Sequence, residues 1–388
     1  MLALGALGVT GCSSVEQSEG TDATSDELVR DSLTPIALRT PVLPSAEFER
    51  VRAGLLRRNA RYDIAANAVI NRNLMQLTGV TLPSDVRQVA EVQKKVSADL
   101  VAADLTARDA FVRANPGERL PELAIHVFPS FTAFDWRKEG KVTPVRDQGN
   151  CGSCWDFAAL GAFEGSYLIR NGGSPDASEQ QILECSGAGS CGGGFYTGVW
   201  TFMEGTAPHG AATEAARPYS APTVLACDTS LSRPYRVVTW GYVGANPQQP
   251  TVAEIKKALT TYGPLATTVL AAGGFFGYSS GVYDEAPPTD AAGNRKFDIN
   301  HAITLIGWDD AKHAWLIKNS WGNGWGSEAG FGSEKGYMWI DFDAANIGLW
   351  TAWVQAQNNR FAIPVRPLIP IIPIRPIPPI RPIIPGRF

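Results

Sequence analysis

The spacing of apolar residues predicts helices in the first third of the chain. Phe48, Val51 and Leu55 recur at steps of three and four residues. A second apolar set continues with similar steps further on: Val86, Val89, Val92, Val96 and Leu100. Pro83 lies between the two sets, and proline interrupts helical hydrogen bonding. We therefore predict a small helical module over residues 45–127 that is broken near Pro83.

A different pattern predicts a mixed domain over residues 128–353. Phe157 and Phe163 fall on one face of a helix that is expected to begin at Cys154 and to end at "NGG". Three later segments have the composition of strands bounded by Gly, Asp or Asn: "HAITLIGW", "AWLIKNSW" and "GYMWIDFD". A helical part followed by a β part predicts the α+β fold class.

Both ends of the chain lack the pattern of a packed core. Residues 13–44 are mostly polar, which is typical of a flexible tether. Residues 354–388 alternate proline with Ile and Arg, so polyproline II structure is expected there. We interpret these residues as an interaction tail with a possible partner of its own. A rigid spacer is the alternative.

The first twelve residues resemble a bacterial lipoprotein signal. The apolar run "LALGALGV" is too short to span a bilayer, and it leads into "VTGC", which resembles a lipobox. In this interpretation residues 1–12 end at Cys12, which carries a lipid anchor to the membrane. The expected location is the bacterial cell envelope or the extracellular space. A plain secretory signal, and hence a secreted protein, is the alternative.

Charge and cysteine content narrow the functional classes. The formal net charge of −4 does not favour nucleic acid as a partner. Five of the six cysteines lie between positions 151 and 227, which suggests two disulfides and one free thiol in an oxidising compartment.

Cys154 is the better candidate nucleophile in "QGNCGSCW", because a helix N-terminus lowers the pKa of a thiol. Cys151 lies in the preceding loop and suits a disulfide. His301 is the preferred imidazole, since it opens an apolar strand that holds it rigidly. The other histidines precede the domain, lie in a loop or lie in a hairpin turn: His126, His209 and His313. A zinc site is disfavoured because no second C-x2-C pair follows, so neither metal nor cofactor is expected.

Five segments occur in an order that resembles the papain-like cysteine peptidases, the papain/cathepsin family. They are "DWRKEGKVTPVRDQGNCGSCW", "SEQQILECSGAGSCGGG", "INHAITLIGW", "WLIKNSWGNGWG" and "GYMWI". The resemblance covers residues 128–353. It implies a two-lobe fold, with a helical left lobe and an antiparallel, barrel-like right lobe, preceded by a helical pro-region.

The resemblance also implies roles for individual residues. Cys154 and His301 form the catalytic dyad, Asn319 orients the imidazole and Gln148 donates to the oxyanion, while Trp321 shields the His301–Asn319 hydrogen bond. The backbone of an extended substrate would pair with Gly193 and Gly194. Its apolar P2 side chain would lie in a pocket formed by Phe195, Ile299, Ala302 and Ala352. The implied disulfides are Cys151–Cys191 and Cys185–Cys227.

The expected function is therefore a cysteine endopeptidase that acts on proteins or peptides and is made as an inhibited proenzyme. For residues 45–127, a partner-binding module is the alternative to an inhibitory propeptide. For the whole chain, the alternatives are a surface-anchored binding protein with an inert scaffold and a thioester-based acyltransferase. Asp156 departs from the family pattern, and its charge is expected to stabilise the first helical turn and to weaken the thiolate slightly.

Overall fold

The computed structural model describes residues 40–120, 131–204, 208–221 and 224–361. The expected signal at residues 1–12, most of the tether, His126 and residues 362–388 of the tail lie outside this part of the chain.

The described chain contains both helices and strands along its length. The helices are α2 (Ser45–Arg58), α3 (Leu74–Leu77), α4 (Val86–Ala114), α5 (Cys154–Arg170), α6 (Glu179–Cys185), α7 (Tyr196–Met203) and α8 (Val252–Tyr262), with 3-10 turns η2 (Ala68–Asn71) and η3 (Gly273–Gly277). The strands are β1 (Tyr62–Ile64), β2 (Ala133–Asp135), β3 (Gly189–Ser190), β4 (Gly193–Gly194), β5 (Val237–Tyr242), β6 (Leu265–Val269), β7 (Tyr278–Tyr283), β8 (His301–Asp309), β9 (Ala314–Lys318), β10 (Tyr337–Asp341) and β11 (Leu349–Ala356).

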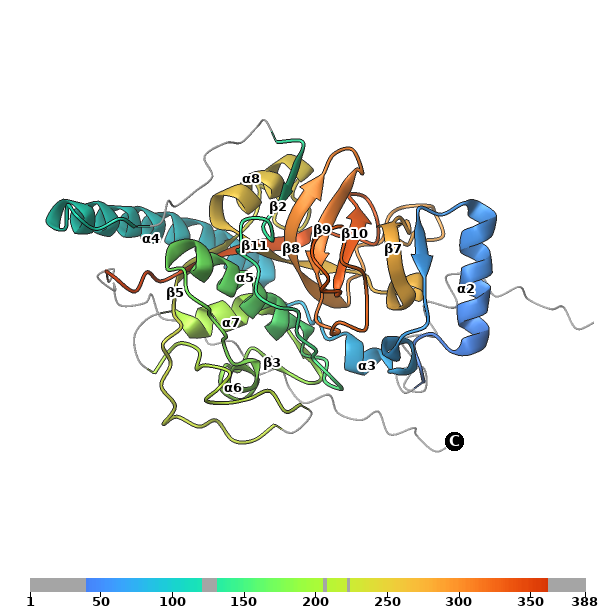
Figure 1. Ribbon diagram of the computed structural model, residues 1–388, viewed down its shortest axis with the longest axis horizontal. Helices are drawn as coiled ribbons and strands as arrows, with labels where there is room; N and C mark the ends of the chain where they lie inside the picture. The colour runs from blue at the N-terminus through green and yellow to red at the C-terminus, as the bar shows by residue number, and fades with distance from the viewer. Residues whose placement is uncertain (1–39, 121–130, 205–207, 222–223, 362–388) are drawn as a thin grey trace, which may run out of the picture.

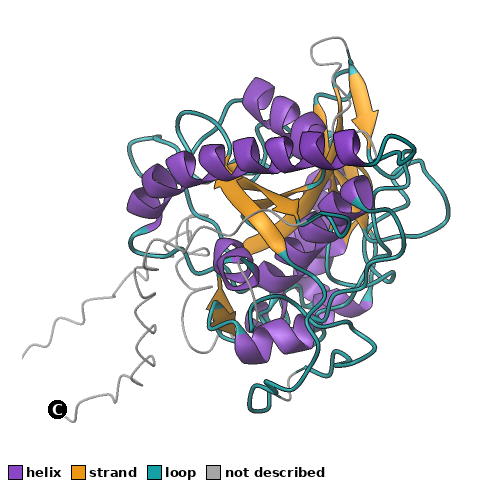
Figure 2. Ribbon diagram, turned by 90° about the vertical axis from the view of Figure 1, so that its left-hand side faces the viewer, coloured by secondary structure: helices purple, strands orange, loops and turns teal. Residues whose placement is uncertain are grey.

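Two apolar cores divide the molecule into a helical lobe and a sheet lobe. The sheet runs in the order β1-β7-β10-β9-β8-β6-β11-β5, with β2 paired to β8, and most of its neighbours are antiparallel. One core lies within this sheet lobe, and the other surrounds α5, α6 and α7. Figure 2 shows the strands in the interior, with helices on more than one side. The predicted α+β fold class is confirmed.

Two small residues let α5 pack closely on the sheet lobe. A Cβ at Gly161 would lie 2.5 Å from the hydroxyl oxygen of Thr304 on β8, and one at Gly165 would lie 2.4 Å from the ring of Pro264. Any larger side chain at either position would push the helix away from the sheet.

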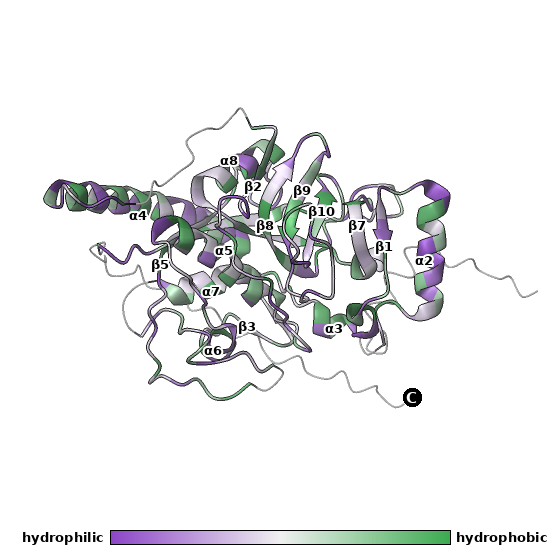
Figure 3. Cartoon of the chain, in the orientation of Figure 1, coloured by the Kyte–Doolittle hydropathy of each residue, from purple (hydrophilic) through white to green (hydrophobic). Residues whose placement is uncertain are grey.

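The N-terminal module contains the helices α2, α3 and α4, as the sequence predicts, and also one short strand that the apolar spacing did not predict. After α2, strand β1 joins the edge of the sheet by pairing with β7. Tyr62 and Ile64 alternate inward and are buried in the sheet-lobe core. Leu43, near the end of the expected tether, is only 1 % exposed, and its backbone N–H donates to the Ile70 carbonyl. Figure 3 shows apolar and polar residues alternating along α2, which packs on one side only.

Helix α4 is a single long helix that packs beside β5 (Figure 1). The predicted apolar stripe is only partly buried, since Val92 is 46 % exposed. Contact is made instead through Val86 and two small residues, Ala90 and Ser97, which allow the helix to approach the strand closely. None of the described helices is both long and apolar enough to cross a membrane.

The last strand of the sheet continues past residue 353, where the sequence places the end of the catalytic domain. Strand β11 runs from Leu349 to Ala356 and pairs with β5, so Val354 lies in the sheet. Its side chain is buried, like those of all the other residues of this strand.

A buried ion pair fastens α4 to the helical lobe. The Arg170 guanidinium, at the end of α5, donates to both carboxylate oxygens of Asp104 at 2.7 Å, and the Gln355 amide donates to one of them. The side chains of Arg170 and Asp104 are 4 % and 1 % exposed. A buried pair of this kind adds little net stability, because both charges lose their hydration, but removing one partner leaves an uncompensated buried charge.

We predict that Asp104→Ala lowers the free energy of unfolding by about 3–5 kcal/mol, because Arg170 would then be buried without its partner. Urea unfolding of the variant against the wild type measures this difference. Asp109→Ala, at an exposed position of the same helix, is the matched control and should change stability by less than about 0.5 kcal/mol. Equal effects of the two substitutions would contradict this role for the ion pair.

Candidate active site

The two disulfides leave Cys154 as the free thiol of the described chain. Cys151 is bonded to Cys191, and the second bridge is Cys185–Cys227, which are the pairings implied by the resemblance. Cys154 is the first residue of α5, as the sequence predicts, and its side chain is fully buried. The helix N-terminus therefore faces the thiol.

His301 lies at the first position of β8 and is held from two sides. Its Nε2 is 2.8 Å from Oδ1 of Asn319, which follows strand β9. The indole of Trp321 stacks on the imidazole at a centroid distance of 4.7 Å. This contact covers the hydrogen bond with an apolar ring, while Nδ1 has no hydrogen-bond partner within the described residues.

Gln148 is buried beside the nucleophile and is fixed by its own contacts. Its Oε1 accepts a hydrogen bond of 2.8 Å from the Ser320 hydroxyl, and its Nε2 donates to the Cys151 carbonyl at 2.8 Å. Nε2 also donates to the carbonyl of Gln76 at 3.1 Å. The amide group that would bind an oxyanion is thus already occupied by a residue of the N-terminal module.

Residues 76–81 cross the junction of the two lobes directly over the dyad. The Trp321 indole N–H donates to the Leu77 carbonyl at 3.1 Å. The backbone N–H groups of Gly79 and Val80 both donate to the carbonyl of Asn300 at 3.0 Å. These contacts join residues 76–81 to the sheet lobe beside His301.

The same segment then pairs with Gly194 in the helical lobe. Gly194 donates to the Gly79 carbonyl at 2.8 Å and accepts from Thr81 at 3.0 Å, in parallel register. A Cβ at Gly79 would lie 1.8 Å from the carbonyl oxygen of Gly152, so only glycine fits at this point of the crossing.

Burial under this segment keeps the dyad uncharged. It raises the pKa of the Cys154 thiol to about 12, although backbone N–H groups of Ala302 and Gly79 oppose the shift. Burial also lowers the pKa of His301 to about 4, and the hydrogen bond with Asn319 offsets this only in part. At neutral pH both groups are therefore neutral in this state.

The residues implied to bind substrate lie together. Phe195, Ala302 and Ala352 belong to the helical-lobe core, and Ile299 packs against the same cluster. Gly193 and Gly194 are buried at the β3–β4 pair beneath residues 79–81. Val80 packs against this cluster too.

Three contributors to the site were not predicted from the sequence. Residues 76–81 show no periodicity, and only the Leu-Thr-Gly stretch hints at an extended crossing. Ser320 follows Asn319 directly, and this adjacency was the available signal. The hydroxyl of Tyr219 donates to the Gln148 carbonyl at 2.9 Å and lies 2.8 Å from Ser153 Oγ. Tyr219 is far away in sequence, and nothing there pointed to it.

Among the described residues, the side chains around Cys154 and His301 do not form a metal-binding group. Within the described residues one His/Asp group is compact enough, with ligand atoms within 4.8 Å of one another: His313, Asp341 and Asp343. His313 lies in the turn between β8 and β9, as predicted, at the far end of β8 from His301. Asp341 is already paired with Arg61.

Residues 131–349 match the family model described as papain family cysteine protease. The chain belongs to the papain family. The match spans more than half of the 388 residues and contains Cys154, His301, Asn319 and Gln148.

Curated relatives share the same region. The chain is 33 % identical over 227 residues to cysteine proteinase 1 of Entamoeba histolytica, covering 56 % of this chain and 66 % of that protein. It is 38 % identical over 206 residues to a cathepsin L-like peptidase of Aedes aegypti, covering 51 % of this chain and 57 % of that protein. The match therefore covers less than two thirds of the length of each of these two relatives.

Solved proenzymes of the papain family share the fold beyond the catalytic region. A digestive procathepsin L2 from Tenebrio molitor matches with a TM-score of 0.58 and 24 % identity, covering 80 % of this chain and 89 % of that chain. A recombinant stem bromelain precursor matches with a TM-score of 0.56 and 23 % identity, covering 81 % and 89 %. The predicted papain-like fold, with a helix-containing region before the peptidase domain, is confirmed.

Asp156, two residues after the papain-family nucleophile, is not the exposed charge that its place in the first helical turn suggests. Its carboxyl is fully buried in α5, and neither oxygen has a hydrogen-bond partner within the described residues. Burial, with Glu179 and Glu214 nearby, raises the pKa of Asp156 well above its usual range. This shift favours the neutral acid, and it therefore opposes the expected effects of a charge on the helix dipole and on the thiolate.

We predict that Asp156 makes the protein less stable as pH rises. Above about pH 4 the unfolded carboxyl is ionised while the native one is protonated, so the native state loses up to about 1.4 kcal/mol per pH unit until the native pKa is reached. Asp156→Asn should remove this loss. Its gain in melting temperature over the wild type should therefore grow between pH 4 and pH 7.

Asp99→Asn, at an exposed position of α4, provides the matched control. A gain for Asp156→Asn that stays constant over the same pH range, or that matches the control, would refute the protonated state.

Proposed function

We propose that the protein is a cysteine endopeptidase made as an inhibited proenzyme. The observation that carries the proposal is the hydrogen-bonded His301–Asn319 pair, covered by Trp321 and set opposite a free thiol at the start of α5. An inert binding scaffold would have no need for this arrangement, and membership of the papain family supports the same reading.

The proposed chemistry uses only residues of this chain. The Cys154 thiolate attacks a peptide carbonyl, and the side-chain N–H of Gln148 and the backbone N–H of Cys154 stabilise the oxyanion. His301 gives its proton to the leaving amine, which yields a thioester and releases the first product. A water that loses its proton to His301 then hydrolyses the thioester and regenerates the thiol.

Residues 76–81 are the proposed inhibitory segment. They occupy Gln148 Nε2, the Asn300 carbonyl and Gly194, and they bury the dyad in its neutral state. Removing the segment would let water reach His301 and Cys154. Proton transfer from the thiol to the imidazole would then give the reactive ion pair at the helix N-terminus.

Labelling with an irreversible epoxide, followed by peptide mass mapping, tests both parts of the proposal. We expect modification at Cys154, slow in the full chain and at least about tenfold faster in Gly79→Ala, because the added methyl overlaps the Gly152 carbonyl and displaces the segment. His301→Ala in the Gly79→Ala background should abolish labelling, since the thiol loses its base.

Gly117→Ala is the matched control, because a Cβ there meets no atom within 4 Å. It should label at the wild-type rate. If the wild type is labelled as rapidly as Gly79→Ala, the result would support a reactive Cys154 but would contradict inhibition by residues 76–81. Absence of labelling in a folded Gly79→Ala would favour the inert scaffold.

An apolar P2 preference is part of the proposal. Phe195, Ile299, Ala302 and Ala352 offer no charged group to the P2 side chain, so a peptide library should be cleaved best at aliphatic or aromatic P2. Ala352→Glu should raise the cleavage of peptides with Arg at P2 about tenfold or more, because it supplies a carboxylate to the P2 side chain. Ala311→Glu adds the same charge at an exposed turn and should leave the preference unchanged. A wild-type optimum at P2 Arg would contradict this specificity.

We further propose that Cys12 anchors the proenzyme to a bacterial membrane. The support is the "VTGC" stretch after a short apolar run. Two disulfides in the described chain are compatible with an oxidising location outside the cytoplasm.

A further inference from the structure

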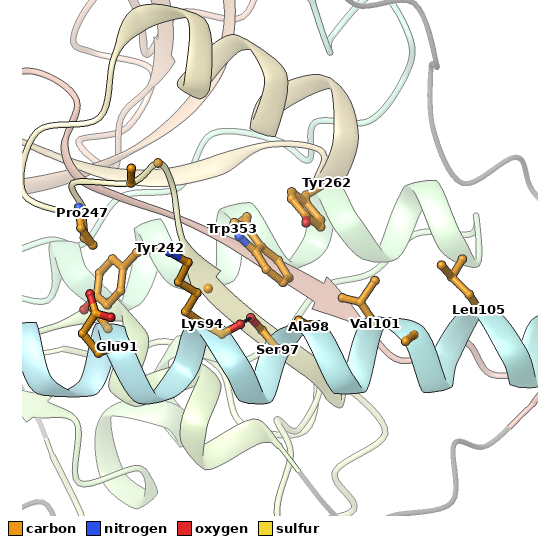
Figure 4. A pocket seen from close by; sticks show the side chains of 15 residues that line it. Glu91, Lys94, Ser97, Ala98, Val101, Leu105, Tyr242, Pro247, Tyr262 and Trp353 are labelled. Carbon is orange, nitrogen blue, oxygen red and sulfur yellow. Dashed lines mark hydrogen bonds between the residues drawn. The ribbon is translucent and has the colours of Figure 1, made fainter.

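A groove lies between helix α4 and the sheet lobe, away from the residues of the dyad. Its volume is about 440 Å³. Figure 4 shows Tyr242, Tyr262 and Trp353 on the sheet side, facing side chains that point from α4. The Tyr262 and Trp353 rings stack at a centroid distance of 3.9 Å, with their planes 7° apart.

The chemistry of this groove suits a proline-rich strand. Aromatic side chains, with Pro247 beside them and the small Ala98 opposite, give the groove an apolar lining. Such surfaces bind polyproline II helices, which lose little conformational entropy because they are already extended. Leu105 at one end of the groove is 48 % exposed, so apolar surface is still available for contact.

The C-terminal tail has a three-residue period that matches this chemistry. Proline occupies every third position from 364 to 385: Pro364, Pro367, Pro370, Pro373, Pro376, Pro379, Pro382 and Pro385. Because polyproline II has three residues per turn, all eight prolines would share one edge. The residue after each proline is apolar up to position 383, so a second edge is aliphatic throughout that range. Tail arginines such as Arg366 and Arg375 fall on the third edge.

The described chain ends next to α4. Phe361 lies 5.9 Å from Phe111 between ring centroids, and Arg360 pairs with Glu118 just beyond the helix. Phe111 is six residues from Leu105, which is about 9 Å along the helix. The tail therefore starts close to one end of the groove, which gives it a high effective concentration there.

The tail is also long enough. The groove follows α4 from Leu105 to Glu91, about 21 Å at 1.5 Å per residue. About seven residues of polyproline II cover this distance at 3.1 Å per residue, and 27 residues follow Phe361. Glu91 at the far end offers a carboxylate to a tail arginine, beside Lys94.

We propose that this groove is a docking site for a polyproline II segment and that its occupant is the chain's own tail, residues 362–388. In this arrangement the tail holds α4 against β5 and β11 from outside, opposite the buried Asp104–Arg170 pair. The proposal rests on the groove and on the period of the tail, and it does not depend on the activity of Cys154.

Photo-crosslinking in the full chain tests the occupant. The photoreactive residue p-benzoylphenylalanine replaces Ile371 on the aliphatic edge, and mass mapping identifies where it reacts. We expect crosslinks within one chain to α4 between Glu91 and Leu105, or to Tyr262 and Trp353. Ala98→Arg, which fills the groove from the exposed side of the helix, should lower their yield about tenfold.

Ala110→Arg is the matched control, because Ala110 is exposed on the same helix but does not line the groove. It should leave the crosslinks unchanged. Crosslinks only between chains, only to added anionic vesicles, or elsewhere on the surface would overturn the proposal. So would an equal yield in Ala98→Arg and the wild type. A melting temperature for each variant confirms that it is folded.

Discussion

The contact of α5 with β8 is the constraint on which the active site depends. Cys154 starts the helix and His301 starts the strand, so the two reacting groups belong to different lobes. Their separation is set by how closely the helix lies on the sheet, and Gly161 and Gly165 provide that closeness. In a close-packed interior even one added methyl group shifts its neighbours. A larger side chain at Gly161 or Gly165 would therefore move α5 and change the separation of Cys154 from His301.

Features that repeat along the sequence were predicted well, and features that depend on distant partners were not. The start of α5 at Cys154 and the place of His301 on β8 follow from apolar periodicity and from the exclusion of other histidines. The papain-like fold followed from five ordered motifs. In contrast, residues 78–81 follow the end of α3 without regular structure, and contacts of residues 76–81 with Gln148, Asn300 and Gly194, far away in the chain, hold them in place.

Buried polar groups account for the remaining errors. An aspartate within a helix is usually exposed, yet Asp104 is fully enclosed because Arg170, 66 residues away, pairs with it. Asp156 is enclosed without any partner among the described residues. The two buried carboxyls differ in their surroundings: Asp104 is paired with a guanidinium, whereas burial without such a partner in the described chain raises the pKa of Asp156 well above its usual range. Neither environment is visible in a local sequence window.

Strand β1 has a further consequence for the life of the molecule after activation. It covers the outer edge of β7, and the sheet ends at β1 on that side. Release of the N-terminal module would bare the backbone N–H and C=O groups of β7 between Tyr278 and Tyr283. An unprotected edge of this kind recruits other strands. The N-terminal module, which also carries the proposed inhibitory residues 76–81, therefore shields the edge of β7 from pairing with strands of other molecules.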